Sequence, residues 1–194
     1  MGISLLYKPL GEGIRGNSFR KNGIWHIVIN KNDMTERRNF TIAHELFEIH
    51  LSGDNSLSLE EKHKLANEYA AEFLLPESDF RNPAHCLDLY ELKEVFPEVS
   101  HEVIARRLIS FIPAVITIFD NRIITSRFAS RGINYPLSVS GEEISLMEEC
   151  YKSESKIDSC QDTYKICGYY LEEMNGIKRV ILILELDELI IEGF

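Results

Sequence analysis

The stretch FTIAHELFEIHL, residues 40–51, decides how the first half of the chain folds. Its apolar residues recur at the three- and four-residue spacing of one helix face: Phe40, Ala43, Phe47 and Leu51. This spacing predicts an amphipathic helix, and either Asp33 or Thr35 can cap its start. Just before it, apolar residues alternate in GIWHIVINKN, residues 23–32, which predicts a strand.

His44 and Glu48 lie four residues apart on this helix. Each residue advances by about 100°, so the two side chains lie about 40° apart and can reach one ion. His50 is about 240° around the helix from His44, so we expect a packed or partner-bonded core histidine there instead of a ligand. Glu45, beside His44, is placed to take a proton from a water molecule at the ion.

A second helix, predicted from about Leu59 to Leu75 and ended by Pro76, is expected to supply a third ligand, because a catalytic zinc site needs three protein groups and an open position. Apolar residues mark one face of it: Leu65, Ala66, Tyr69, Ala70, Phe73 and Leu74. His63 and Asn67 lie at the edge of this face. We predict His63 as the ligand and Asn67 as a residue that orients a ligand through its amide.

His44, Glu48 and His63 together provide two imidazoles and one carboxylate, which Zn²⁺ accepts at nearly equal distances. The same nitrogen and oxygen donors also suit Mn²⁺ or Fe²⁺, so the metal identity stays open. The alternative is that Glu48 is an ordinary solvated glutamate one turn after a histidine, with no metal nearby.

Composition limits the partners. The 194 residues carry a formal net charge of −10, whereas nucleic-acid affinity comes from clustered Lys and Arg. Direct nucleic-acid binding, for example by a helix-turn-helix within residues 91–109, is therefore not expected, and a neutral or basic protein partner suits the chain better.

The sequence shows neither a signal peptide nor a membrane-length apolar run, so we predict a cytoplasmic protein without a membrane partner. The four cysteines form no C-x-x-C pair and are expected to be thiols.

Near Pro113 the sequence pattern changes from that of helices to that of strands. Strands are predicted at residues 114–120, 122–128, 168–174 and 179–186, and a short helix around residues 141–151. We place a boundary near residue 111, with a smaller β-rich region at residues 111–194 that senses a ligand or positions a substrate.

Two stretches resemble the ImmA/IrrE metallopeptidases. RRNFTIAHEL, residues 37–46, is similar to the family's R-x-x-F-T-x-A-H-E-L-x-H, and ANEYAAEFLLP, residues 66–76, is similar to the end of its E-x-x-A-N-x-F-A-A-x-L-L-x-P. FPEVS followed by ARRL, at residues 96–100 and 105–108, resembles the family's later helical pair. The resemblance covers residues 24–110.

This resemblance implies an α+β fold, with a zincin-like metallopeptidase domain at residues 1–110. It also implies an intracellular zinc-dependent endopeptidase that cleaves a regulatory protein, typically a helix-turn-helix transcriptional repressor of a mobile element, stress response or phage defence. By position, His44 is the first ligand and Glu45 the catalytic base. The family's second histidine falls on Glu48 and its distal glutamate on His63, so the two donor types are exchanged between the helices.

An alternative function is a catalytically inactive, metal-stabilised binding module that antagonises a repressor or other protein without cleaving it. The presence of Glu45 favours the peptidase, because a purely structural site needs no base beside the ion. The residue that would stabilise an oxyanion is open between Tyr69 and His85, although packing is the more expected role of Tyr69.

Overall fold

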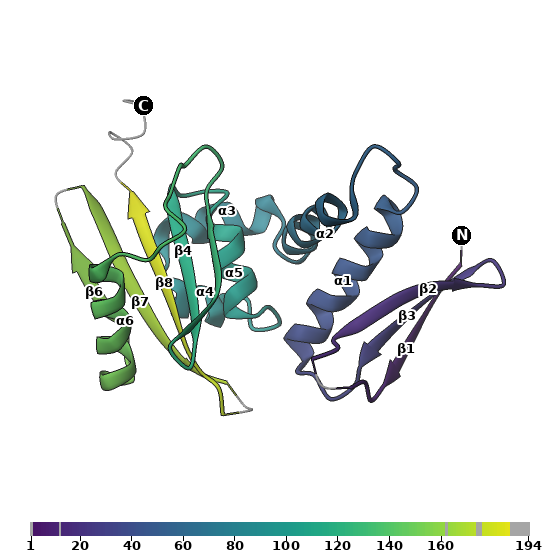
Figure 1. The fold of residues 1–194 in the computed structure, drawn as a ribbon, viewed down its shortest axis with the longest axis horizontal. Coiled ribbons are helices and arrows are strands. Elements are labelled where there is room, and N and C mark those ends of the chain that lie inside the picture. The colour runs from purple at the N-terminus through teal and green to yellow at the C-terminus, as the bar shows by residue number, and fades with distance from the viewer. Residues whose placement is uncertain (1, 12, 162, 174–175, 187–194) are drawn as a thin grey trace. The chain divides into compact units, whose positions relative to one another are not determined.

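The computed structural model describes residues 2–11, 13–161, 163–173 and 176–186, which contain six helices and two sheets (Figure 1). The predicted mixed α+β class is confirmed. The chain divides into two compact units: Met1–Arg81 with Glu91–Ile104, and Asn82–Tyr90 with Ala105–Phe194. The assignment of residues 1–110 and 111–194 as domains stays a prediction.

The first unit joins a small sheet to a helical hairpin. Its strands are β1 (Ile3–Lys8), β2 (Gly16–Lys21) and β3 (Ile24–Asn30), and its first helices are α1 (Thr35–Leu51) and α2 (Leu59–Leu74). The sheet order is β1-β3-β2, with β1 parallel and β2 antiparallel to β3. Apolar side chains of α1 and β3 form the core between helix and sheet: Ile42, Leu46 and Ile49 with Trp25, Ile27 and Ile29.

The two helices of this hairpin begin differently. The residue before α1 is Met34, and no side chain caps the helix, so the predicted cap at Asp33 or Thr35 is wrong. Thr35 is already helical, and one carboxylate oxygen of Asp33 instead faces the guanidinium groups of Arg15 and Arg37. Before α2, Ser58 and Glu61 form a reciprocal capping box, which sets where this helix starts.

Three shorter helices follow: α3 (Glu77–Cys86), α4 (Leu89–Val95) and α5 (His101–Leu108). Lys93 of α4 donates hydrogen bonds to Glu36 of α1 at 2.8 Å and to the carbonyl groups of Pro97 and Val99. These contacts hold the stretch after α4 against the start of α1.

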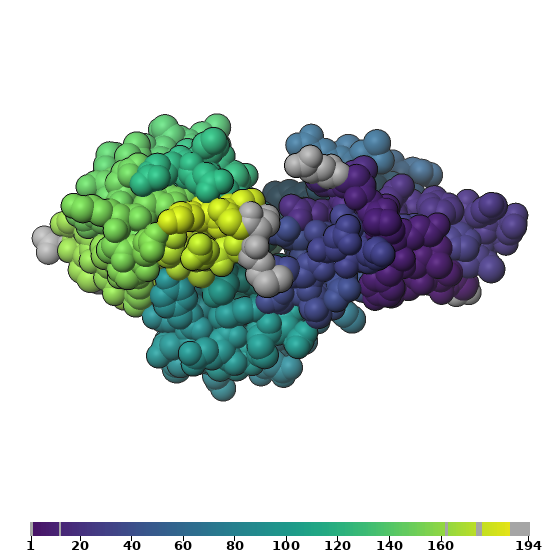
Figure 2. Space-filling model, turned by 90° about the horizontal axis from the view of Figure 1, so that it is seen from below, coloured from purple at the N-terminus to yellow at the C-terminus, as the bar shows by residue number. Residues whose placement is uncertain are grey.

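The second unit is built on a five-stranded antiparallel sheet with the order β5-β4-β8-β7-β6. Its strands and helix are β4 (Ala114–Asp120), β5 (Ile123–Ala129), α6 (Gly141–Ser153), β6 (Ile157–Cys160), β7 (Tyr164–Glu172) and β8 (Lys178–Leu186). Leu146, Met147 and Cys150 of α6 pack on this sheet, and Arg127 pairs with buried Glu143 at 2.7 Å. The elements can be followed on the surface by colour in Figure 2.

The four cysteines are free thiols, as predicted. Cys150 and Cys167 are buried, and this burial raises the pKa of each thiol to about 11. None of the helices in the described residues has both the length and the apolar character that crossing a bilayer requires.

Gly168 of β7 gives a test of the packing in the second unit. A Cβ added there would lie 2.5 Å from Sγ of Cys150 and 3.0 Å from Cδ2 of Leu182. We therefore expect Gly168→Ala to lower the free energy of unfolding by about 1–3 kcal/mol, measured by urea denaturation. Gly141→Ala is the control, because its added Cβ meets nothing within 4 Å, and it should change the free energy by at most about 0.5 kcal/mol. Equal effects of the two changes would contradict this packing.

Candidate metal centre

The helical hairpin of the first unit carries all three predicted ligands. The sheet-facing core holds α1 through Ile42, Leu46 and Ile49. His44 and Glu48 lie about 200° and 240° around the helix from Ile42, on the side of α1 that meets His63 of α2. The capping box at Ser58 starts α2 so that His63 falls in its second turn. Local helix geometry and these two anchors therefore bring the three side chains to one place.

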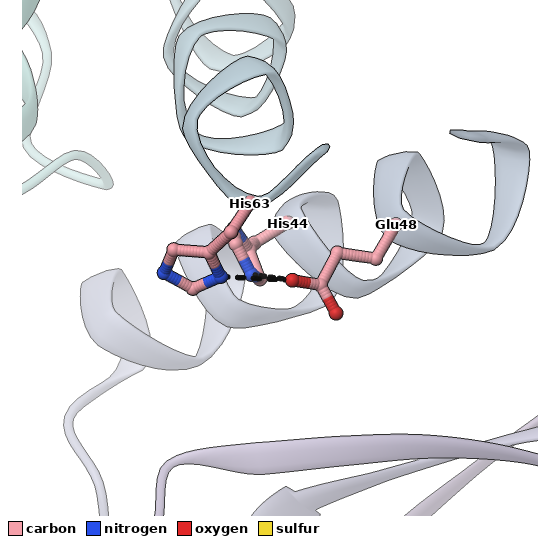
Figure 3. A group of neighbouring side chains, drawn as sticks. All are labelled: His44, Glu48 and His63. Atoms are coloured by element: carbon pink, nitrogen blue, oxygen red, sulfur yellow. Dashed lines mark hydrogen bonds and ion pairs between the residues drawn. The ribbon is translucent and has the colours of Figure 1, made fainter. Parts of the chain in front are cut away.

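The three side chains converge on one carboxylate oxygen (Figure 3). Nε2 of His44 lies 3.0 Å from Oε1 of Glu48, and Nδ1 of His63 lies 2.9 Å from the same oxygen. The two imidazole rings meet edge to face, with centroids 4.7 Å apart. One ligand atom from each residue lies within 4.8 Å of the other two.

This donor set fits a divalent ion. Two imidazole nitrogens and one carboxylate oxygen are ligands that zinc accepts, and their spacing allows one ion to contact all three. Without an ion, the two nitrogens can share the Glu48 oxygen only if each donates a proton to it. Nδ1 of His44 is buried and has no hydrogen-bond partner among the described residues, so Nε2, the nitrogen that faces Glu48, is the one available for coordination.

Exposure changes steadily across the three ligands. The side chains of His44, Glu48 and His63 are 11%, 33% and 63% exposed. The centre is thus covered by protein on the side of His44 and open to solvent on the side of His63. An open side is what a catalytic site needs, because water and substrate must reach the ion.

Glu45 lies beside this centre and is 7% exposed. Burial raises the pKa of its carboxyl above the ordinary value; a hydrogen bond from Ser18 and the nearby His44 and His63 oppose this effect, while Glu48 adds to it. A buried carboxylate next to two imidazoles can exchange a proton with a group held at the centre. Glu45 is therefore buried beside the centre, and its role as the base stays a prediction.

The contact between Ser18 and Glu45 was not foreseen from the sequence. Ser18 lies on β2, and the alternation in GNSFRK, residues 16–21, could have grouped it with Gly16 on one strand face. Periodicity alone does not say which strand β2 pairs with, so it could not direct that face towards α1.

His50 differs from the prediction of a packed core histidine, because its side chain is exposed. Ile49 and Leu51 are the buried residues of this last turn. They lie about 100° to either side of His50, which leaves the imidazole between them facing outward. His50 is also absent from the ligand group that the described residues form.

The other residues considered earlier lie as follows. Asn67 is half-buried one turn after His63, and its amide forms no hydrogen bond with a ligand in the described residues, so its orienting role stays a prediction. Tyr69 packs on Phe47 with ring centroids 5.4 Å apart, as expected. His85 contacts Phe111 within the second unit.

Comparison with known families agrees with the geometry. The family described as IrrE N-terminal-like domain, a family of peptidases, matches residues 1–109, which include the sheet, both helices of the hairpin and all three residues of the cluster. A comparison with curated proteins found no match. The match covers more than half of the chain, and the resemblance to ImmA/IrrE proteins is confirmed. The chain therefore belongs to the peptidase family of the IrrE N-terminal-like domain.

Proposed function

We propose that the protein is a zinc-dependent endopeptidase of zincin-like fold that acts in the cytoplasm and cleaves a helix-turn-helix transcriptional repressor. The observation that carries this proposal is the convergence of His44, Glu48 and His63 beside the buried carboxylate of Glu45. Membership of a peptidase family gives the reaction class, peptide-bond hydrolysis.

In this proposal, three residues of the centre bind the metal ion and a fourth transfers the proton. His44, Glu48 and His63 would hold a divalent ion, which supplies Lewis-acid chemistry by lowering the pKa of a water molecule and polarising the scissile carbonyl. Glu45 takes the proton from the attacking water and passes it to the leaving amine. The buried position of Glu45 limits its exchange with bulk solvent, so the proton stays at the site between the two steps.

The negative net charge of the chain and the exposure of His63 support a protein substrate that is rich in Lys and Arg. A repressor that binds DNA carries clustered Lys and Arg, and the net charge of −10 attracts such a partner. The ligand on the open side, His63, lies on α2 at the surface of the unit, where a segment of a folded protein can reach it.

The test uses the purified protein and the helix-turn-helix repressor encoded nearest to its gene. We expect discrete repressor fragments by mass spectrometry, no fragments after treatment with a chelator, and recovery on adding Zn²⁺. Parallel additions of Mn²⁺ and Fe²⁺ identify the metal that supports cleavage.

If the metal-loaded protein binds the repressor and leaves it intact, the peptidase proposal is wrong and a binding module that antagonises the repressor explains the site.

A further inference from the structure

Strand β2 directs two of its residues towards helix α1. Gly16 pairs with Ile29 and Ser18 with Ile27 in the antiparallel β2–β3 ladder. Paired residues of neighbouring strands share a face of the sheet, and Ile27 and Ile29 face α1 through the core they form with Ile49. Gly16 and Ser18 therefore lie on the face that α1 covers.

Gly16 sets how closely β2 approaches α1. A Cβ at this position would lie 2.6 Å from Cγ2 of Thr41 and 3.1 Å from the carbonyl oxygen of Val28. The Thr41 hydroxyl donates a hydrogen bond to the carbonyl of Arg37 at 2.9 Å, which restrains the rotamer of Thr41 and keeps its methyl group against β2. Only glycine fits this spacing without a shift of the strand or the helix.

Ser18 lies two residues further along β2 and contacts the next turn of α1. Glu45 follows Thr41 by one turn of α1, and Ser18 follows Gly16 by two residues of β2. The close approach of Gly16 to Thr41 therefore brings the Ser18 hydroxyl within hydrogen-bonding reach of the Glu45 carboxyl, where it lowers the pKa of that group against the effect of burial. A glutamate has three rotatable side-chain bonds, so without this hydrogen bond its carboxylate would sample several orientations.

We infer that Ser18 is a positioning residue, which orients the Glu45 carboxylate for proton transfer, and that Gly16 makes this possible by letting β2 lie directly against α1. The inference rests on the proposed function, in which Glu45 is the base. A serine hydroxyl has one donor hydrogen, so Ser18 can engage one carboxylate oxygen of Glu45 and leave the other for the proton of the attacking water.

The first test needs neither metal nor substrate. Urea unfolding of the metal-free protein is measured for wild type, Ser18→Ala, Glu45→Ala, which removes the hydrogen-bond acceptor, and the double variant. We expect the shift in midpoint of the double variant to differ clearly from the sum of the single shifts, because the two side chains interact. Additive shifts would overturn the inference whatever the protein cleaves.

The second test separates positioning from general stability. With metal content equal to wild type, Ser18→Ala is expected to lower kcat on the repressor about tenfold with unchanged KM, and Ser18→Thr, which keeps the hydroxyl, to recover most of it. Asn17→Ala, on the opposite face of β2, is the control and should keep wild-type kcat.

The role of Gly16 is tested with a second substitution that removes the Thr41 methyl group, which a Cβ at position 16 would meet. Gly16→Ala should lower kcat, and adding Thr41→Ser should restore part of it, because serine lacks the methyl group that the new Cβ meets most closely and keeps the hydroxyl, while the contact with the Val28 carbonyl remains. Wild-type kcat in Ser18→Ala, with Glu45→Gln inactive, would overturn the positioning role and leave the proposed function standing. Wild-type cleavage by Glu45→Gln would instead overturn Glu45 as the base.

Discussion

Glu45→Gln is expected to bind metal as wild type does and to cleave the repressor about 10²- to 10⁴-fold more slowly, the usual contribution of a general acid–base group. Glutamine keeps the size of the side chain and can still accept the hydrogen bond from Ser18, but it cannot take a proton from water. Single-turnover cleavage and metal analysis of the same preparation measure the two properties together.

Loss of activity in this variant should not come from unfolding. Burial raises the pKa of Glu45 in the metal-free protein, which means that folding disfavours its charged form at neutral pH. Replacing the carboxylate by a neutral amide removes that penalty, so the urea midpoint should not fall. Glu60→Gln, a charge-neutralising change at an exposed position of α2, is the matched control and should cleave normally. Cleavage by Glu45→Gln at the wild-type rate would exclude Glu45 as the base.

Loss of a single metal ligand is expected to have the second large effect. Structural zinc sites bind with apparent free energies of about 10–16 kcal/mol, so removing one of three protein ligands should weaken binding by about two to three orders of magnitude. We expect this loss for His44→Ala, Glu48→Ala and His63→Ala alike. Competition with a chromophoric chelator measures the affinities.

His50→Ala is the control on the same helix, because His50 is exposed and lies outside the ligand group. It should bind metal as wild type does. Full metal affinity in Glu48→Ala or His63→Ala would contradict the ligand set, and loss in His50→Ala alone would move the missing ligand to that residue.

A reciprocal exchange tests why the donors differ from the family pattern. The variant Glu48→His with His63→Glu keeps two imidazoles and one carboxylate and returns each donor type to the helix that carries it in the related family pattern. We expect this double variant to keep metal, although the longer glutamate changes the reach from α2. Metal loss here, with binding retained in wild type, would show that the helix spacing is matched to the exchanged arrangement.

The sequence by itself determined the helix of residues 40–51 and the pairing of His44 with Glu48. The sequence also indicated His63, because the apolar face of the second helix shows which polar residues lie at the edge of that face, next to the first helix. These predictions succeeded because helical periodicity is local: angular positions along one helix depend only on the spacing of residues. The strand before the helix and the end of α2 at Leu74, before Leu75 and Pro76, follow from equally local patterns.

Tertiary structure decided the features that depend on which elements meet. The exposure of His50 follows from which sides of the last turn of α1 are buried, and the missing cap of α1 follows from Asp33 facing Arg15 and Arg37 instead. The contact of Ser18 with Glu45 depends on the pairing of β2 with β3 and on the close approach at Gly16. Strand pairing joins residues far apart in the chain, and no period in the sequence records which strands pair. The cluster of His44, Glu48 and His63 could therefore be predicted from two helices, whereas the surroundings of Glu45 required the folded sheet.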